Sequence, residues 1–433
     1  MTTLRTTKKY ILQNPNDFKD KLTQWCCIFD DFLLLTSNNY PQKHSTFSFV
    51  AALGKQTELK TNGKTVFNDL KKYHNQTNDY IFGYISYDAK NTNPKLTSTN
   101  FDGLGFDDLY FFQPKKLFLI KDNILEIKYL NDYSFEIETD YQQILTTEIQ
   151  SENYQNSIKI NQRISKEKYV EKAKEFLQHI QRGDIYEANF CMEFFAENAT
   201  INPLETYKKL NQKTEAPFAV YGKFGENYVI CASPERYLRK ESNTILSQPI
   251  KGTAKRFSDK ILDDSAKNEL KNNPKERSEN IMIVDLVRND LSKTATKNSV
   301  HVTELCEVYS FKTVHQLIST IQSTISESTD CVEVFETTFP MGSMTGAPKI
   351  SAMQLIEQLE ETKRGVYSGS IGYLTPEKNF DFNVVIRSVL YNSEKKYLSF
   401  SVGSALTSKA IPEAEYEECL LKAEAMREVL GEL

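Results

Sequence analysis

An amphipathic helix that passes directly into a strand is the sequence feature that most restricts the fold. From Tyr169 to Ile180, apolar residues recur at the spacing of one helix face, with Ser165 placed to cap the start and Gly183 to end the helix. Over residues 186–194, apolar side chains then alternate with other residues at the period of a strand. The chain is therefore expected to contain a helix and a strand with only a short connection between them.

Later segments extend this mixture without a strict strand–helix–strand repeat. A second helix is indicated by Asn273 as its cap, Pro274 in its first turn and Glu276 at the third position, ahead of an apolar run. The other expected elements are a third helix after residue 348, strands at 366–373, 382–391 and 397–402, and a last helix over residues 412–430. Elements in this order predict the α+β class.

The first third of the chain differs in character. Residues 1–160 are rich in Asn, Thr, Lys and Tyr, suggest short strands such as 80–87 and 110–118, and carry no motif that indicates a chemistry. Apolar periodicity is lost over residues 146–163. We therefore expect an N-terminal subdomain at 1–160, of no assigned function, and a second domain at 161–433.

The composition excludes several classes of protein. The 53 Lys and Arg residues against 58 Asp and Glu give a net charge of −5 without a basic block, so we expect no nucleic-acid partner. No run approaches the roughly 18 apolar residues of a membrane span, and no apolar segment follows the basic start, so we expect a cytoplasmic protein without a signal peptide or membrane contact. Seven Cys without CxxC spacing and five His without an HExxH pattern give a zinc enzyme no support.

A glycine-containing loop precedes the third helix. Gly342, Ser343, Thr345 and Gly346 could turn backbone N–H groups toward an anion at the helix start. The loop lacks the Lys and Ser/Thr that follow the second glycine of a Walker A loop, so we do not expect nucleotide phosphate as its ligand. The glycines could also serve only to permit a tight turn, and the sequence leaves both interpretations open.

Two expected helices carry carboxylates on one face. Glu276 and Glu279 are three residues apart on the second helix, and Glu415, Glu418 and Lys422 share a face of the last one. Oxygen ligands from two helices can hold Mg²⁺ and leave positions open for a substrate carboxylate. The alternative is an ordinary solvated face with a Glu418–Lys422 pair.

Two further residues have the chemistry of a nucleophile and an acid. Lys251 lies between a proline and a glycine, and a lysine that loses its proton can attack carbon. Glu235 can donate a proton if an apolar setting raises its pKa. The ordinary alternatives are a surface charge for Lys251 and a salt bridge, for example to Arg236, for Glu235.

Nine segments occur together and in order. They are GDIYEANF, SPERYL, PIKGT, KERSENIMIVDLVRNDL, VHQLIST, FPMGSMTGAPKISAM, RGVYSG, FNVVIRS and EAEYEECLLKA. From about residue 164 to residue 430 the chain closely resembles the chorismate-utilising enzymes, which include anthranilate synthase component I, aminodeoxychorismate synthase component I, and isochorismate and salicylate synthases. The resemblance implies a two-part sandwich of antiparallel sheets with outer helices around a central chorismate cleft.

The resemblance also implies roles for individual residues. Mg²⁺ would lie between Glu279 and Glu418, with Glu276 and Glu415 as further possible ligands. His315 matches a family histidine that handles a proton or orders the ring. Together with the loop and helix patterns above, the family motifs give these expected substrate contacts: Gly252, Thr253, Thr345, Tyr367, Arg387, Gly403 and Lys422.

Lys251 separates the branches of the family. Anthranilate synthases usually have alanine there, whereas aminodeoxychorismate synthases resemble this chain in having lysine. In that branch the amine adds at C2 of chorismate while the C4 hydroxyl leaves, protonated by the equivalent of Glu235, and ammonia then attacks C4 and expels the lysine. Isochorismate-type enzymes have a water-activating lysine where this chain has Glu187, and glutaminase-dependent branches generally have glutamine there.

The resemblance therefore predicts a Mg²⁺-dependent transferase of EC class 2.6.1, an aminodeoxychorismate synthase component I of para-aminobenzoate and folate synthesis. The alternatives are anthranilate synthase component I and, more remotely, an inactive regulatory member. Thr36 replaces the glutamate of the LLES segment of tryptophan-inhibited anthranilate synthases, which argues against that inhibition. Because Cys26 and Cys27 lack a nucleophile-turn context, we expect ammonia to come from a separate glutamine amidotransferase subunit.

Overall fold

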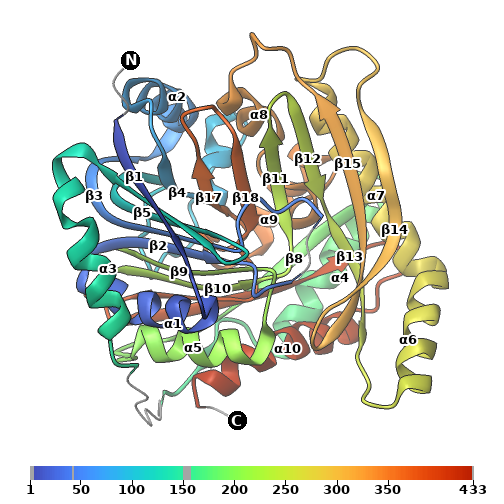
Figure 1. Cartoon of the computed structure of the whole chain (residues 1–433). Helices are drawn as coiled ribbons and strands as arrows, with labels where there is room; N and C mark the ends of the chain where they lie inside the picture. Colours follow the sequence, from blue (N-terminus) through green and yellow to red (C-terminus); the bar gives the residue numbers. More distant parts are fainter. Residues whose placement is uncertain (1–3, 41–42, 150–157, 432–433) are drawn as a thin grey trace.

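Two antiparallel layers of strands share the long strand β5 (Leu109–Lys121) in the computed structural model, which describes residues 4–40, 43–149 and 158–431 (Figure 1). β5 pairs with β3 along its length, with β4 through residues 109–112, and with β6 through residues 116–121. The two layers are therefore continuous at this strand.

The elements have the following bounds. The other strands are β1 (Arg5–Ile11), β2 (Asp31–Thr36), β3 (Phe49–Thr61), β4 (Ile81–Ile85), β6 (Ile124–Leu130), β7 (Asn161–Gln162), β8 (Glu187–Ala196), β9 (Phe218–Phe224), β10 (Asn227–Ser233), β11 (Arg236–Glu241), β12 (Thr244–Gln248), β13 (Ile250–Lys255), β14 (His301–Ser310), β15 (Val314–Thr324), β16 (Gly346–Ala347), β17 (Ser370–Leu374), β18 (Phe380–Val384), β19 (Ser388–Asn392) and β20 (Tyr397–Leu406). The α-helices are α1 (Pro15–Trp25), α2 (Val66–Thr77), α3 (Ile137–Thr146), α4 (Lys166–Arg182), α5 (Pro203–Thr214), α6 (Lys260–Asn272), α7 (Pro274–Ser292), α8 (Cys331–Thr338), α9 (Lys349–Leu359) and α10 (Pro412–Val429).

The strand order of each layer follows from the pairings. The first layer runs β1-β6-β5-β3-β2-β9-β10-β19-β20-β8, and the short strands β7 and β16 pair with β8. The second runs β4-β17-β18-β11-β12-β15, with β13 and β14 both paired to β15. The predicted α+β class and the sandwich of antiparallel sheets are confirmed.

Alternation along the strands builds the two main cores. In β2, Leu33 belongs to the core between the layers, whereas Phe32 and Leu34 belong to the core under the outer helices, because successive side chains of a strand point to opposite faces. The helices α1, α3, α4, α5 and α10 pack on that outer core, and Figure 1 shows α1, α5 and α10 along one side of the first layer.

The predicted helix starts are confirmed. Ser165 caps α4, its hydroxyl accepting from the Lys168 N–H, and Gly183 ends the helix at a φ of 83°. Asn273 caps α7, its side chain accepting from the backbone N–H groups of Lys275 and Glu276. These local patterns set where the two helices begin, and α7 carries two of the predicted carboxylates.

Two crossings between the layers correct a predicted strand. The chain passes from the first layer to the second between β10 and β11, and back again between β18 and β19. The strand predicted at 382–391 is therefore wrong as one element, because Arg387 adopts a φ of 53° at the second crossing. The strand predicted at 366–373 begins only at Ser370, because residues 366–369 form a turn.

Strands from the first third of the chain lie inside both layers. β2 pairs with β9, and β4 pairs with β17. The division at residues 160 and 161 stays a prediction, because residues 150–157 of the expected connection lie outside the described residues. Within the described part of the chain, no helix combines the length and apolar character that a membrane crossing needs.

Candidate active site

The two crossings place Glu235 and Arg387 side by side. Glu235 lies just before β11 and Arg387 just before β19. The backbone N–H of Ala232 donates to the carbonyl of Arg387 at 3.1 Å, and the N–H of Val384 donates to the carbonyl of Glu235 at 3.0 Å. Backbone hydrogen bonds thus tie the two crossings together, and one carries an acid while the other carries a guanidinium.

Lys251 forms an ion pair with Glu187. Its Nζ lies 3.1 Å from Oε1 of Glu187, and the two side chains are 13% and 2% exposed. Burial by itself would lower the pKa of Lys251, but the carboxylates of Glu187, Glu279 and Glu418 outweigh it and raise that pKa. The lysine therefore carries its charge here, and to act as a nucleophile it must pass a proton to a neighbour.

Glu235 has the buried setting expected of an acid. The residue is 4% exposed, and burial raises its pKa to about 7, although the Ser343 hydroxyl and Lys251 oppose the rise. The Ser343 hydroxyl donates to Oε1 of Glu235 at 2.7 Å. A carboxyl with a pKa near neutrality can give up a proton at physiological pH.

The carboxylate faces of α7 and α10 meet across Lys275. The Lys275 Nζ lies 3.9 Å from Glu279 and 3.6 Å from Glu415. On α10, Lys422 contacts Glu418 at 2.6 Å and donates to the carbonyl of Gly403 at 2.7 Å. Each of the two interpretations of α10 therefore holds in part. Glu418 is paired with Lys422, and it also faces the carboxylates of α7.

Glu279 has an unsatisfied oxygen that suits a cation. Among the residues that the structure describes, its buried Oε1 has no hydrogen-bond partner, and burial raises its pKa to about 7. No described group of three or more His, Cys, Asp or Glu side chains forms a ready metal cluster. Mg²⁺ commonly uses one or two carboxylates and completes its shell with substrate and water, so Glu279 and Glu418 fit this ion.

Several of the expected substrate contacts lie near these carboxylates or near one another. Gly252 has a φ of 97°, and a Cβ there would lie 3.0 Å from Glu276 Oε2, so the backbone approaches the carboxylates closely and Thr253 follows it. The hydroxyl of Tyr367 lies 3.7 Å from Cys191 Sγ. Within the described residues, the Arg387 guanidinium has no hydrogen-bond or ion-pair partner, and burial lowers its pKa, opposed by Tyr367 and Glu418.

The side chains of two predicted residues make no recorded contact with these groups within the described chain. The Thr345 hydroxyl donates within its own loop, to the carbonyls of Met341 and Gly342. The imidazole of His315 contacts Ser310 at 2.8 Å and Asp263 at 3.1 Å. Their substrate and proton roles stay predictions.

The glycine-containing loop takes the form of a tight turn. A Cβ on Gly346 would lie 2.1 Å from the carbonyl oxygen of Glu187, so the close pairing of β16 with β8 requires glycine there. The same loop carries Ser343 to Glu235. Sequence reasoning assigned Ser343 only to the loop and missed this contact, because no local pattern links residues 108 positions apart.

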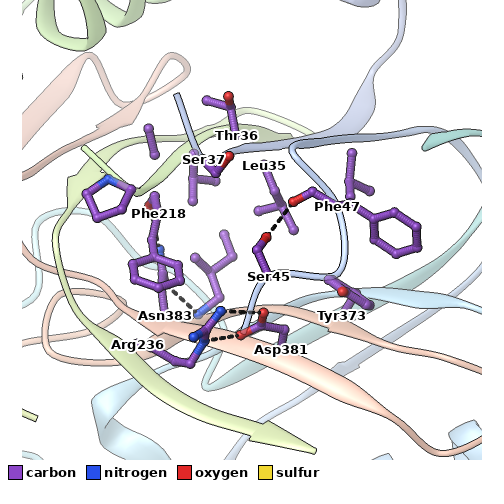
Figure 2. Close-up of a pocket in the computed structure, with 15 residues that line it drawn as sticks. Leu35, Thr36, Ser37, Ser45, Phe47, Phe218, Arg236, Tyr373, Asp381 and Asn383 are labelled. Atoms are coloured by element: carbon purple, nitrogen blue, oxygen red, sulfur yellow. Dashed lines mark hydrogen bonds and ion pairs between the residues drawn. The ribbon is translucent and has the colours of Figure 1, made fainter. Parts of the chain in front are cut away.

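A separate cavity lies away from these residues. It lies between the N-terminal strands and β9, β17 and β18 (Figure 2), with this lining: Leu35, Thr36, Ser37, Ser45, Phe47, Val50, Pro217, Phe218, Ala219, Val220, Arg236, Ile371, Tyr373, Asp381 and Asn383. Its one carboxylate, Asp381, is engaged by Arg236 at 2.9 Å. The cavity includes Thr36 of the LLES-like segment.

Comparison with known proteins identifies the family. The chain belongs to the chorismate binding enzyme family, whose model matches residues 30–428. It is 42% identical over 272 residues to a probable chloroplastic aminodeoxychorismate synthase of Oryza sativa subsp. japonica, covering 62% of this chain and 30% of that protein. It is 30% identical over 355 residues to anthranilate synthase component 1 of Thermus thermophilus, covering 80% of this chain and 76% of the relative.

Solved structures carry the same fold. The menaquinone-specific isochorismate synthase MenF of Escherichia coli superimposes with a TM-score of 0.78 at 16% identity, over 98% of this chain and 94% of that one. Among the relatives, the chain spans only 28% to 56% of the length of the aminodeoxychorismate synthases it matches. The family and the fold are thus established, and the activity is a separate question.

Proposed function

We propose that this chain is an aminodeoxychorismate synthase component I, which converts chorismate and ammonia to 4-amino-4-deoxychorismate. The observation that carries the proposal is the position of Lys251, held at 3.1 Å from Glu187 beside the carboxylates of α7. A lysine in this place can form a covalent intermediate, which divides one difficult displacement into two easier ones. Relatives named aminodeoxychorismate synthase, 34% to 42% identical, support the same activity.

The proposed reaction uses the two residues in sequence. The Lys251 ammonium gives one proton to the Glu187 carboxylate, which releases it to solvent, and the amine bonds to C2 of chorismate while both ring double bonds shift and the C4 hydroxyl leaves as water with the proton of Glu235. Ammonia then bonds to C4, both double bonds shift back, and the lysine amine leaves C2 with its electron pair. Burial of Glu235, which raises its pKa to about 7, supports its role as the acid.

Mg²⁺ and Arg387 would bind the carboxylates of chorismate. Glu279 and Glu418 would hold the ion, with Glu276 and Glu415 close by, and the bound ion would neutralise and anchor a substrate carboxylate. The guanidinium of Arg387, which has no partner among the described residues, suits the second carboxylate, because its planar fork donates two N–H groups to two oxygens. Such a reaction belongs to EC class 2.6.1 and supplies para-aminobenzoate for folate synthesis.

A separate glutamine amidotransferase would supply the ammonia. Several relatives are named component 1. Of the described cysteines, Cys331 lies 3.9 Å from a histidine, His74, but both are buried and burial raises the pKa of Cys331 to about 12. A thiol in that state is a poor nucleophile. The cytoplasmic location expected from the sequence stays a prediction, and two relatives are named chloroplastic.

Anthranilate synthase component I is the second candidate. It is favoured by the relative from Thermus thermophilus, which matches a larger share of both chains than the rice protein does. The two activities differ in product and are separated by one assay.

The test is to incubate the purified chain with chorismate, Mg²⁺ and ammonium chloride and to identify the products by mass spectrometry. We expect 4-amino-4-deoxychorismate as the main product. Anthranilate as the sole product would establish the second candidate. No chorismate consumption under any of these conditions, with chorismate binding intact, would favour an inactive member of the family.

A further inference from the structure

One oxygen of Glu187 is buried beside the proposed nucleophile and has no partner. Oε1 of Glu187 pairs with Lys251, whereas no donor in the described part of the chain reaches Oε2, although the residue is 1% exposed. A buried acceptor without a donor is destabilising, because it has lost its hydrogen bonds to water. A small ligand with N–H groups would remove that penalty.

The charges around Glu187 favour a monovalent cation over a divalent one. From β13, Lys251 contributes a positive charge at 3.1 Å, and from α7 and α10 the carboxylates of Glu279 and Glu418 face the same lysine. The carboxyl group of Glu235, which lies just before β11, also interacts electrostatically with Lys251. The repulsion between the Lys251 ammonium and a divalent ion at Oε2 would be twice the repulsion between that ammonium and a monovalent ion. β16 closes the remaining side with backbone, through the pairing of Ala347 with Glu187.

We propose that Oε2 of Glu187 binds the ammonium ion, so that this chain, when no amidotransferase delivers ammonia, takes ammonium from solution and generates ammonia inside the site. The inference rests on the proposed function, which requires a nitrogen nucleophile next to Lys251. It assigns a task to a residue that differs from the glutamine expected at this position in glutaminase-dependent relatives.

The proton balance of the step is simple. A bound ammonium ion passes one proton to the Glu187 carboxylate, giving neutral ammonia and a carboxylic acid. The ammonia then forms the bond to C4, and the lysine amine leaves C2 as described above. The protonated nitrogen now on C4 loses a proton to solvent, and Glu187 returns its proton to solvent before the next turnover. No oxidant or further reactant is needed.

Steady-state kinetics with ammonium at several pH values tests the proposal. At fixed total ammonium, free ammonia rises about tenfold for each pH unit while the ammonium concentration stays nearly constant. For Glu187→Gln, we expect kcat/KM for total ammonium, at saturating chorismate, to follow this tenfold rise between about pH 6.5 and 8. For the unmodified chain we expect a much smaller rise, and near pH 7 a KM for ammonium at least about tenfold lower than that of the variant.

A second kinetic parameter, kcat/KM for chorismate, distinguishes ammonium binding by Glu187 from a role in which Glu187 only assists Lys251. At saturating ammonium, kcat/KM for chorismate reports the attack of the lysine. A loss in Glu187→Gln confined to this parameter would overturn the proposal, since Glu187 would then serve Lys251 alone. A changed Mg²⁺ requirement with unaltered ammonium dependence would also overturn it.

Asp184→Asn is the matched control. Asp184 is an exposed carboxylate three residues earlier, paired with His179 and Arg182, so its loss removes the same charge outside the site and should leave both parameters unchanged. If Glu187→Gln fails to fold, as judged by thermal melting, the unmodified chain still decides the point, because a tenfold rise per pH unit in its own ammonium kinetics refutes ammonium binding. If the unmodified chain makes no aminodeoxychorismate, the proposed function itself has failed.

Discussion

The ammonium group of Lys251 and the carboxylate of Glu187 form an ion pair between β13 and β8, at a distance of 3.1 Å. β8 lies in the first layer of strands, whereas β13 is attached to the second through β15. The pair therefore spans the two layers, and the lysine faces the carboxylates of α7 because its strand is anchored opposite them.

Replacing Lys251 separates its charge from its nucleophilicity. We expect Lys251→Ala to abolish formation of 4-amino-4-deoxychorismate and to leave slow production of anthranilate, as ammonia reaches C2 directly. Lys251→Arg keeps the positive charge beside Glu187 but cannot be deprotonated, so it should be equally inactive in aminodeoxychorismate formation. Product analysis by mass spectrometry checks both variants. An Arg variant with near-normal rates would show that only the charge matters.

The pH profile should report Glu235. Because the acid must be protonated and burial raises its pKa to about 7, kcat/KM for chorismate should fall as the pH rises through that value. The Ser343 hydroxyl stabilises the ionised carboxylate, so Ser343→Ala should raise the pKa further and move the fall to higher pH. Ser343→Thr keeps the hydroxyl and serves as the control. A profile unchanged by Ser343→Ala would remove Glu235 from the reaction.

Turnover should depend on Mg²⁺. Glu279→Gln and Glu418→Gln should each lower activity by more than about 100-fold with little change in melting temperature, because both carboxylates act on Lys251 and, among the described residues, one oxygen of Glu279 has no hydrogen-bond partner. Glu417→Gln is the control, since that neighbouring carboxylate is 58% exposed and pairs with Lys166. Full activity in excess chelator would contradict the prediction.

Tryptophan should neither inhibit the chain nor raise its melting temperature. In the cavity of Figure 2, Thr36 offers no charge to an amino group, and Asp381 is already paired with Arg236. Thr36→Glu would add a carboxylate at this wall and provides a positive control for the assay. A melting temperature raised by tryptophan in the unmodified chain would show that the cavity binds it without that carboxylate.

Local patterns in the sequence predicted those features of the structure that depend on residues close together in the chain. Ser165, Gly183 and Asn273 define helix ends through contacts within a few residues, and the i, i+3 spacing of Glu276 and Glu279 places both on one face of α7. The family motifs supplied the remainder of the expected site. That the faces of α7 and α10 meet at Lys275 depends on packing between distant segments.

The parts that escaped prediction lack a local signal. The apolar pattern continues through residues 382–391, so no sequence signal predicts the change of layer at Arg387. Its positive φ follows from the position of the chain between the two sheets. The contact of Ser343 with Glu235 and the pairing of Glu187 with Lys251 join residues far apart along the chain. Such pairs follow from the topology and not from spacing.

The edge formed by α6, β13 and β14 has a small core of its own. Leu270, Cys306 and Leu317 are its fully packed apolar residues, whereas Ile261 of α6 is 80% exposed. Regions with few buried apolar contacts open at lower free energy than the rest of a molecule, so the amides of α6 and β14 should exchange with solvent before those of the layers joined by β5. Lys251, the proposed nucleophile, lies on β13 at this same edge, so the strand that carries it should lose its protection from exchange earlier than the strands of the sandwich.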